Sequence, residues 1–332
     1  MGEYILGVDG GGTKTHYALF DIKGNMVEFL ESGPVNHEVL EEGFEGSKRE
    51  LHTSISKILK KAGKKQDDIG YAVFGLAGAD ISTQKKELKR IVLETGITRI
   101  KVVNDAFLTI KAGSRFRYGI GCINGTGTCC VGIGTNGGTI QVGGTGYFFG
   151  DEAGSSHIGN MVIRKVYDSV FRCGTETMMT DMLLDELEID SVYELVDAVY
   201  AKVYTDKINV NEFNRICFKA ANQGDKVAIY LLKHIGKEMA LSILGAINNL
   251  CFSGTDEIDV VLAGSVNVNG ENPNLLNTLQ DVVKEKSDKR IIFNILKEPP
   301  VLGAVLWALE EVIGDIPFQL KQKITKNIGR SN

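Results

Sequence analysis

Apolar and polar positions alternate with two different periods along this chain of 332 residues. Short apolar runs bounded by glycine or polar residues predict β-strands over 4–8, 16–20, 71–78, 100–105, 118–123, 129–133 and 291–296, with a further strand and glycine turn within 258–268. Helical or continuous apolar patterns predict helices over 45–63, 82–94, 105–113, 155–173, 175–188, 191–203, 212–250 and 300–312. Strands that alternate with helices in this way indicate an α/β protein.

One unit of this pattern occurs twice. A strand over 4–8 leads into a Gly/Thr turn, a second strand and the polar turn DIKGN. The same order returns 115 residues later, where the turn NGTGT separates the strands over 118–123 and 129–133. Each copy predicts a β-hairpin with glycines and threonines at its tip. We therefore expect two related α/β domains, 1–117 and 118–332, with the helix over 300–313 packing back on the first.

Composition and charge restrict the classes of function. The net charge of −5 predicts no domain-wide basic surface, which argues against nucleic acid as a partner. The apolar stretch 227–252 contains four charged or ionisable side chains, so we interpret it as a buried amphipathic helix and expect no membrane partner. The six cysteines contain no C-x-x-C pair, which favours a reduced, cytoplasmic protein over a zinc or disulfide site. The basic end of the chain, with Lys321, Lys323, Lys326 and Arg330, predicts a solvated C-terminus.

The first glycine tip, DGGGTKT, is not one of the two common phosphate motifs. A threonine stands before Lys14 where the Walker A pattern requires glycine, and both that pattern and the dinucleotide pattern require a helix to follow. The residues after Thr15 instead have a strand pattern. Successive glycine N–H groups still form a concave site for anions, and Thr13, Thr15, Thr126 and Thr128 add hydroxyl donors. A single tip of this kind is more often a simple tight turn, but two tips and a third glycine turn favour phosphate binding.

Two aspartates stand at the ends of predicted strands. Asp9 precedes the first glycine tip, where a carboxylate next to phosphate requires a cation between them, so we expect it to hold Mg²⁺ through water. Asp105 ends the strand over 100–105. It is either the N-cap of the next helix or an acceptor for the proton of an attacking hydroxyl, with about even odds from the sequence alone.

Several motifs, in order, resemble the N-acetylglucosamine kinase family, which is grouped with the BadF/BadG-type ATPases of the sugar kinase, heat-shock-cognate and actin superfamily. They are DGGGTKT (9–15), PVNH (34–37), GLAG (75–78), VVNDA (102–106), NGTGT (124–128), GGTGYFFGDEAGS (143–155) and LAGSV (262–266). The run GDEAGS after a glycine-rich stretch is the most specific. The zinc-binding cysteine motif of the repressor/open-reading-frame/kinase sister family is missing from the sequence.

The resemblance implies a fold of two ribonuclease-H-like domains with ATP in the cleft, and it implies a role for individual residues. Asp105 would be the catalytic base. Nucleotide would be bound by Gly11, Gly12, Thr13, Lys14, Gly125, Thr126, Gly127, Gly264 and Ser265. The sugar would be held by Asn36, Asn104, Asp105, Gly144, Thr145 and Asp151.

The resemblance also implies the activity: an ATP- and Mg²⁺-dependent kinase that phosphorylates N-acetylglucosamine and/or N-acetylmuramic acid, in most family members at the 6-hydroxyl, in amino sugar or cell-wall salvage. A homodimer is expected because such kinases are often dimeric. Glu38 and Thr145 depart from the aromatic residues that the resemblance leads us to expect near the sugar, and the small Thr145 leaves room for a bulkier sugar or for glucosamine.

Two other classes of function stay open. The first is a BadF-type ATPase that activates a dehydratase or reductase through an iron–sulfur cluster between subunits, although Cys129 and Cys130 are adjacent on one strand and would point to opposite faces. The second is a sugar sensor without catalytic activity, against which the intact Asp105 and both phosphate loops argue.

Overall fold

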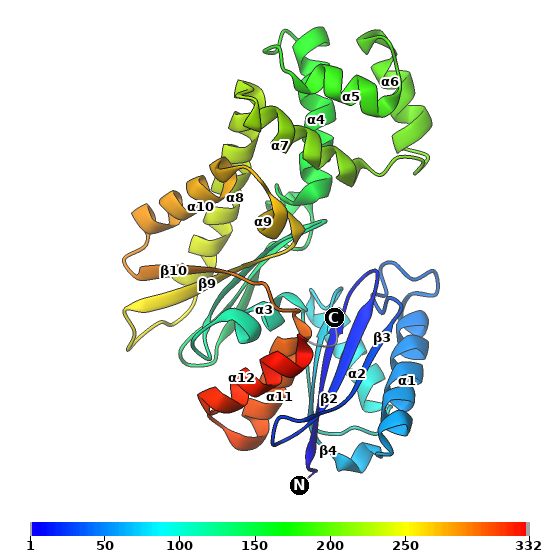
Figure 1. Ribbon diagram of the computed structural model, residues 1–332, viewed down its shortest axis with the longest axis vertical. Coiled ribbons are helices and arrows are strands. Elements are labelled where there is room, and N and C mark those ends of the chain that lie inside the picture. The colour runs from blue at the N-terminus through cyan, green and yellow to red at the C-terminus, as the bar shows by residue number, and fades with distance from the viewer. Residues whose placement is uncertain (1, 330–332) are drawn as a thin grey trace.

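The computed structural model describes residues 2–329, and within them the strands form two five-stranded sheets. The first sheet contains β1 (Tyr4–Gly10), β2 (Thr15–Asp21), β3 (Met26–Ser32), β4 (Ile69–Leu76) and β5 (Ile100–Val103). The second contains β6 (Gly119–Asn124), β7 (Thr128–Ile133), β8 (Thr139–Val142), β9 (Glu257–Ala263) and β10 (Arg290–Ile295). Figure 1 places the two sheets one above the other, with a helical region at the far end of the second.

The two sheets have the same topology. The spatial order is β3-β2-β1-β4-β5 in the first and β10-β9-β6-β7-β8 in the second, so β6 corresponds to β1 and β9 to β4. In each sheet the first three strands are antiparallel neighbours, and the next two run parallel to the first strand. The repeat of the glycine hairpin thus belongs to a duplicated sheet, and the predicted α/β class with two ribonuclease-H-like sheets is confirmed.

Helices cover the sheets and extend the second one. They are α1 (Gly43–Ala62), α2 (Ser82–Leu93), α3 (Ala106–Gly113), α4 (Gly154–Phe171), α5 (Met179–Leu187), α6 (Leu195–Ala198), α7 (Asn214–Asn222), α8 (Lys226–Asn248), α9 (Ser265–Asn269), α10 (Pro273–Lys286), α11 (Val301–Ile313) and α12 (Phe318–Ile328). The segment from α4 to α8 is inserted between β8 and β9 and forms the upper part of the molecule in Figure 1. Among the described residues no helix is both long and apolar enough to cross a membrane.

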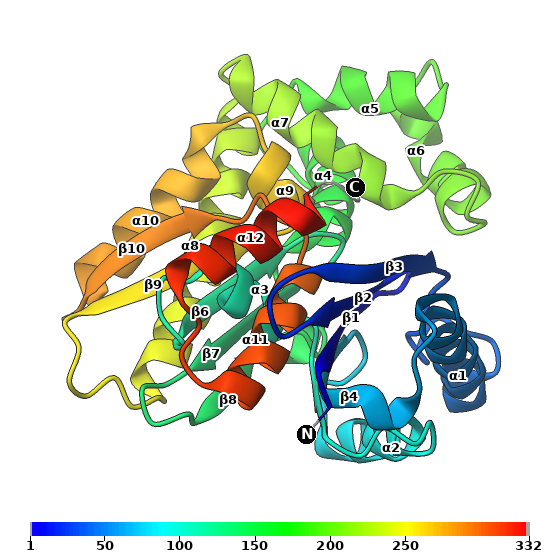
Figure 2. The ribbon, with the colours of Figure 1, turned by 60° about the horizontal axis from the view of Figure 1, so that its bottom comes forward.

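The hydrophobic core consists of three clusters. One packs α1 and α2 on the outer face of the first sheet, and another packs α8, α10 and neighbouring helices on the second sheet. The third joins the inner faces of both sheets through α3 and α11, with Leu108 and Val305 among its fully buried members. Figure 2 shows α11, from the end of the chain, beside β1 of the first sheet. Lys111 of α3 and Glu310 of α11 form a largely buried ion pair at 2.6 Å.

The structure corrects several predicted elements. The single helix predicted over 212–250 is two helices, because Gly224 adopts φ +87° and Asp225 caps α8 by accepting a hydrogen bond from the N–H of Ala228. The helix predicted over 191–203 is reduced to short turns, the four-residue α6 and a π-helical turn at Val199–Val203. No strand was predicted at β3 or β8, and no helix at α10 or α12.

The expected solvated C-terminus is only partly correct for the residues that the structure describes: Lys323 and Lys326 are exposed, but the helix that carries them is packed on the core. α12 buries Ile324 and Ile328 against the core between the sheets, and Lys321 donates to the carbonyl of Ser114 at 3.1 Å. Burial lowers the pKa of Lys321. Arg330 lies outside the described residues.

Candidate active site

The two glycine tips lie at corresponding ends of the two sheets. The first connects β1 to β2 and is closed by a hydrogen bond from the N–H of Gly11 to the carbonyl of Lys14 at 3.0 Å. The second connects β6 to β7 and is closed by the N–H of Gly125, which donates to Gly127 at 2.9 Å. The chain bends here only because β1 and β6 end in glycine-rich turns, whose N–H groups are able to approach an anion closely.

The threonines of the tips do not all have the role expected for them. Thr13 and Thr126 are exposed at the two tips, as phosphate contact requires. Thr15 is fully buried and its hydroxyl donates to the carbonyl of Gly33 at 2.9 Å. The hydroxyl of Thr128 donates to the carbonyl of Ile123 at 3.0 Å. A hydroxyl has one hydrogen to donate, so these last two stabilise the hairpins rather than a ligand.

The second tip is held by the segment GDEAGS. The N–H groups of Ser155 and Ser156, in the first turn of α4, donate to the carbonyls of Gly125 and Thr126 at 2.8 and 3.1 Å. The N–H of Gly154 donates to the side-chain oxygen of the fully buried Asn124 at 2.7 Å. The order of the motif thus has a local cause, because the start of α4 holds the carbonyls of the second tip.

The segment LAGSV (262–266) packs directly on this tip. β9 ends at Ala263, and Gly264 follows with φ +90°. A Cβ at Gly264 would lie 2.4 Å from the carbonyl oxygen of Asn124, so a side chain cannot be accommodated without a shift of the backbone. The structure therefore brings Gly264 and Gly125 together, as the resemblance implied.

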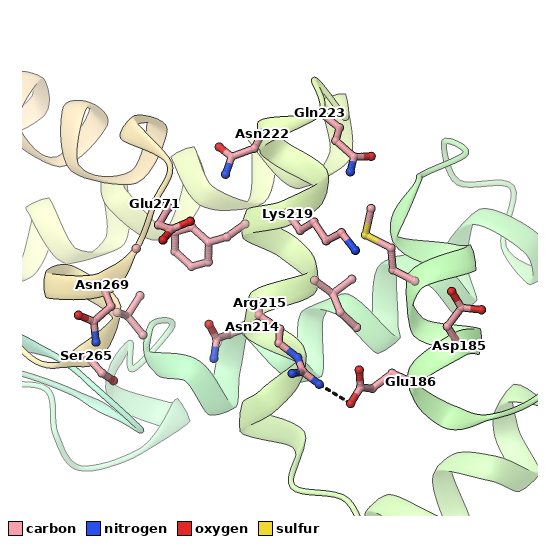
Figure 3. Close-up of a pocket in the computed structure, with 15 residues that line it drawn as sticks. Asp185, Glu186, Asn214, Arg215, Lys219, Asn222, Gln223, Ser265, Asn269 and Glu271 are labelled. Carbon is pink, nitrogen blue, oxygen red and sulfur yellow. Dashed lines mark hydrogen bonds and ion pairs between the residues drawn. The ribbon is translucent and has the colours of Figure 1, made fainter.

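A cavity of about 840 Å³ opens beside Ser265, within the range of sites that hold a nucleotide-sized ligand. One wall comes from the α9 region, and the opposite wall comes from α7 and α5 (Figure 3). Arg215 of α7 and Glu186 of α5 form an ion pair on the helical wall, while Asn214, Asn269 and Lys219 add polar groups. Sequence reasoning found Ser265 but missed the helical wall, because no motif marks the residues of α7.

Asp105 follows β5 but does not cap α3 with its side chain. The side-chain oxygen of the preceding Asn104 accepts the hydrogen bond from the N–H of Ala106 at 2.9 Å instead. Burial, together with the negative charge of Asp80, raises the pKa of Asp105 to about 6. Asn104 therefore caps α3, and of the two roles considered for Asp105 the role of proton acceptor is the one left.

Asp9 lies at the end of β1 within the electrostatic reach of Asp105. Burial is the main cause that raises its pKa to about 7, the charge of Asp105 adds to the effect, and Lys14 opposes it. Lys14 itself is exposed and lies 3.3 Å from Glu31. Two neighbouring buried carboxylates are unfavourable unless a proton or a cation lies near them.

Three of the residues expected to hold a sugar, Asp105, Gly144 and Asp151, lie near Cys129 of β7. Burial and the charges of Asp105, Asp80 and Asp151 keep the pKa of the Cys129 thiol well above its usual range, so these carboxylates come together from both sheets. A Cβ at Gly144 would lie 2.8 Å from the Cys129 sulfur. The sequence predicted no role for Cys129 or Asp80, although Asp80 follows the glycines of GLAG at the end of a strand.

Asp151 has a clear local role. Its carboxylate accepts hydrogen bonds from the N–H groups of Gly144 and Gly146, at 2.8 and 2.5 Å. It thereby fixes the turn that carries the exposed Thr145. The aromatic residues that follow, Tyr147 to Phe149, are exposed on the next part of the loop, with Phe148 at 95%.

Asn36 is buried beside the GLAG turn. Its side-chain oxygen accepts the N–H of Glu38 at 2.9 Å. Gly78, with φ +79°, allows this packing, because a Cβ there would lie 2.5 Å from the same oxygen. The N–H of Val35 donates to the carbonyl of Gly11 at 3.3 Å, which connects this segment to the first glycine tip.

Comparison with known proteins agrees with this geometry. The chain is 29% identical over 268 residues to an N-acetylmuramic acid/N-acetylglucosamine kinase of Clostridium acetobutylicum, covering 80% of this chain and 86% of that protein. It is 24% identical over 318 residues to an N-acetyl-D-glucosamine kinase of Dictyostelium discoideum, covering 92% and 98%. It is also 25% identical over 247 residues to a glucosamine kinase of Vibrio cholerae, covering 73% and 80%.

Solved structures show the same fold. A protein of Chromobacterium violaceum, described as a candidate N-acetylglucosamine kinase, superposes with a TM-score of 0.65 at 21% identity, covering 93% of this chain and 99% of that one. A hexokinase of Thermus thermophilus superposes with a TM-score of 0.55 at 18% identity, covering 93% and 99%. The model of the BadF/BadG/BcrA/BcrD ATPase family matches residues 6–308, nearly the whole chain, and the protein belongs to that family.

Proposed function

We propose that this protein transfers the γ-phosphate of ATP to the 6-hydroxyl of an amino sugar, N-acetylglucosamine and/or N-acetylmuramic acid. The observation that carries the proposal is Asp105, a half-buried carboxylate just after β5 that leaves the capping of α3 to Asn104. The named relatives, which act on three amino sugars, support the substrate class.

Each half of the site has its own part. The N–H groups of Gly11 and Gly125 already donate within the two tips. The other N–H groups of the tips and the hydroxyls of Thr13 and Thr126 bind the triphosphate, and Lys14 adds a positive charge at the first tip. The cavity beside Gly264 and Ser265 takes the adenosine. The polar wall formed by Arg215, Asn214 and Asn269 supports this assignment, since an adenine needs both donors and acceptors at its edge.

Asp105 accepts the proton of the sugar hydroxyl as the oxygen attacks the γ-phosphorus. A pKa of about 6 leaves the carboxylate ionised at neutral pH and still basic enough to accept a proton. The sugar is held by Asn36, Asn104, the turn of Gly144 and Thr145, and Asp151, which fixes that turn. Closure of the two domains would keep water from the phosphate.

The residues present fit Mg²⁺. Asp9 is a half-buried carboxylate near Asp105. Burial is the main cause that raises its pKa, the charge of Asp105 adds to the effect, and Lys14 opposes it. Mg²⁺ prefers a site of phosphate oxygens, waters and one or two carboxylates, so Asp9 would hold it through water. When bound, the ion would neutralise charge on the phosphates.

Glucosamine is the second candidate substrate, because a glucosamine kinase is among the relatives. A dehydratase activator has less support from the thiols. Cys130 is buried in the core of the second sheet, whereas Cys129 packs on the core between the sheets, so the pair points to opposite faces as expected.

The deciding experiment is an ATP-coupled assay with N-acetylglucosamine, N-acetylmuramic acid, glucosamine and glucose, followed by NMR of the phosphorylated product. We expect turnover with an N-acetylated amino sugar and a phosphate on O6. Turnover with none of these sugars, or a brown protein with iron and acid-labile sulfide, would overturn the proposal. A homodimer also stays a prediction, for which light scattering after size exclusion is the measurement.

A further inference from the structure

One oxygen of Asp80 connects the two domains beside Asp105. Asp80 lies between β4 and α2 of the first domain, and its Oδ1 accepts a hydrogen bond from Nδ2 of Asn104 at 2.8 Å. The same atom accepts a second bond from Nε2 of Gln141 at 2.7 Å. Gln141 belongs to β8, in the second sheet. Asp80 thus contacts both the residue before the candidate base and the strand that leads to Gly143 and Gly144.

Both partners of Asp80 are fixed in orientation. Asn104 is 4% exposed, and its own oxygen accepts the N–H of Ala106, so its amide nitrogen must face Asp80. Nε2 of Gln141 also donates toward the carbonyl of Gly143 at 3.3 Å. A flipped Gln141 would place its oxygen against a carboxylate and a carbonyl, which is unfavourable.

The fixed orientation of Gln141 leaves its oxygen without a partner. Oε1 of Gln141 is buried and makes no hydrogen bond with the residues that the structure describes. Buried polar atoms in native proteins are nearly always paired, so an unpaired acceptor at the edge of a candidate site indicates a missing donor. Sugars supply such donors as hydroxyl and amide N–H groups.

Asp80 is also tied to the loop that carries Asn36. The N–H groups of Asp80 and Ile81 donate to the side-chain oxygen of Gln84 at 3.2 and 3.0 Å. The amide nitrogen of Gln84 donates in turn to Glu38 at 2.9 Å. Movement of Asp80 would therefore reach three segments of the sugar side: 36–38, 104–105 and 141–144.

We propose that Asp80 and Gln141 are positioning residues that link the two domains, hold Asn104 and Asp105 at the site, and present Oε1 of Gln141 as a hydrogen-bond acceptor for the sugar. The proposal rests on the amino sugar kinase activity proposed above for the identity of the donor. The link itself does not depend on that activity, because its hydrogen bonds exist in the protein without ligand.

Asp80 offers a matched pair of variants. Both hydrogen bonds end on the same oxygen, so Asp80→Asn keeps the acceptor and removes only the charge, whereas Asp80→Ala removes both. We expect Asp80→Ala to lower kcat at least 50-fold and Asp80→Asn to retain at least a fifth of it. Gln141→Ala should raise the KM for the sugar at least tenfold and leave the KM for ATP within twofold. Thr139→Ala, at an exposed position on the same strand, is the control and should behave as wild type.

Steady-state kinetics of these variants is combined with hydrogen exchange of the ligand-free protein. We expect faster exchange of the amides of 139–143 in Asp80→Ala than in wild type, with Asp80→Asn close to wild type. Equal impairment of Asp80→Asn and Asp80→Ala would overturn the positioning role, and so would a sugar KM in Gln141→Ala within twofold of wild type. If wild type phosphorylates no amino sugar, the kinase proposal fails while the exchange data still decide the link: unchanged exchange in Asp80→Ala overturns it.

Discussion

Asp9 and Asp105 stand at the ends of β1 and β5, and the negative charge of Asp105 contributes to the raised pKa of Asp9. Both are half-buried, and burial is the main reason why each holds a proton more tightly than an aspartate in water. This pair connects the metal-binding role proposed for Asp9 with the role of base proposed for Asp105.

Replacement of Asp105 by asparagine should abolish most turnover and preserve binding. The amide has a similar shape but accepts no proton, so kcat should fall about 10²–10⁴-fold, the usual contribution of a general base. The KM for ATP should change less than threefold. Asp67→Asn, in an exposed turn of the same domain, is the matched control. A kcat above a tenth of wild type would remove Asp105 from the role of base.

The pH profile of kcat should follow the ionisation of Asp105. Only the carboxylate accepts the proton, and burial raises its pKa to about 6. We therefore expect kcat to be constant above about pH 7 and to fall below pH 6, by about tenfold per unit. The measurement is kcat at saturating sugar and ATP from pH 5 to pH 9, with circular dichroism to show that the protein stays folded. A profile flat down to pH 5 would contradict this assignment.

Replacement of Asp9 by asparagine should stabilise the protein at alkaline pH. The pKa of Asp9 rises from 3.8 to about 7 on folding, so its contribution to the free energy of unfolding is present below pH 3.8 and is lost as the pH rises through about 7. At pH 8 the wild type must bury a charge that the amide lacks. We expect an increase in Tm of a few degrees, since about 1 kcal/mol corresponds to roughly 2–4 °C in a chain of this size.

The same variant should lose activity, and the loss should depend on Mg²⁺. We expect a higher Mg²⁺ concentration at half-maximal rate, with binding of ATP without metal unchanged in calorimetry. The matched comparison is Asp21→Asn, at the opposite end of the neighbouring strand β2. If Asp9→Asn is less stable than wild type at pH 8, favourable interactions in the folded protein outweigh the cost of burying the negative charge of Asp9, which would contradict this prediction.

The sequence predicted much of this arrangement because its signals are local. Glycines end β1 and β6, and the repeat of their pattern indicated two related sheets before any contact was known. The edge strand β8 has four residues, too few for a period to be recognised. The break between α7 and α8 lies at Gly224. It was not predicted, because apolar helical patterns on both sides of this single glycine look like one continuous helix.

The site was predictable only where a motif marks it. Asp105 could be proposed from its place at a strand end, and the resemblance added its role. Asp80 and Gln141 could not be paired, because they lie 61 positions apart and Gln141 belongs to the second sheet, whereas Asp80 follows a strand of the first. No role was predicted for Cys129, because its position among three carboxylates depends on how the two sheets meet.

The contact between Gly264 and the second tip should be essential for nucleotide binding. Gly264→Ala places a Cβ 2.4 Å from the carbonyl oxygen of Asn124 and also strains a residue at φ +90°. Gly254 has a similar φ of +76° but open space around it, so Gly254→Ala carries the backbone strain alone. We expect Gly254→Ala to cost about 1 kcal/mol of stability with a normal KM for ATP. Gly264→Ala should raise that KM at least tenfold; equal KM values in the two variants would contradict the role of the contact.

Glu38 and Thr145 should decide between N-acetylglucosamine and N-acetylmuramic acid. The small, exposed Thr145 leaves room for the lactyl group of the muramic sugar, but that group carries a carboxylate. Burial is the main cause that raises the pKa of Asp80, and the negative charge of Glu38 adds to the effect. The lactyl carboxylate would therefore enter a negative field. Glu38→Gln should therefore increase the ratio of kcat/KM for N-acetylmuramic acid to that for N-acetylglucosamine by about fivefold. This corresponds to roughly 1 kcal/mol, the interaction of two unit charges about 4 Å apart in water, because Glu38 is exposed.

The matched steric variant is Thr145→Trp, which should lower the same ratio because the ring fills the space that the lactyl group needs. Both ratios come from competition of the two sugars in one assay, with the products separated by mass. If neither substitution changes the ratio, the lactyl group of the muramic sugar does not lie near Glu38 or Thr145. If Thr145→Trp changes the ratio and Glu38→Gln does not, steric space rather than charge determines the selectivity between the two sugars.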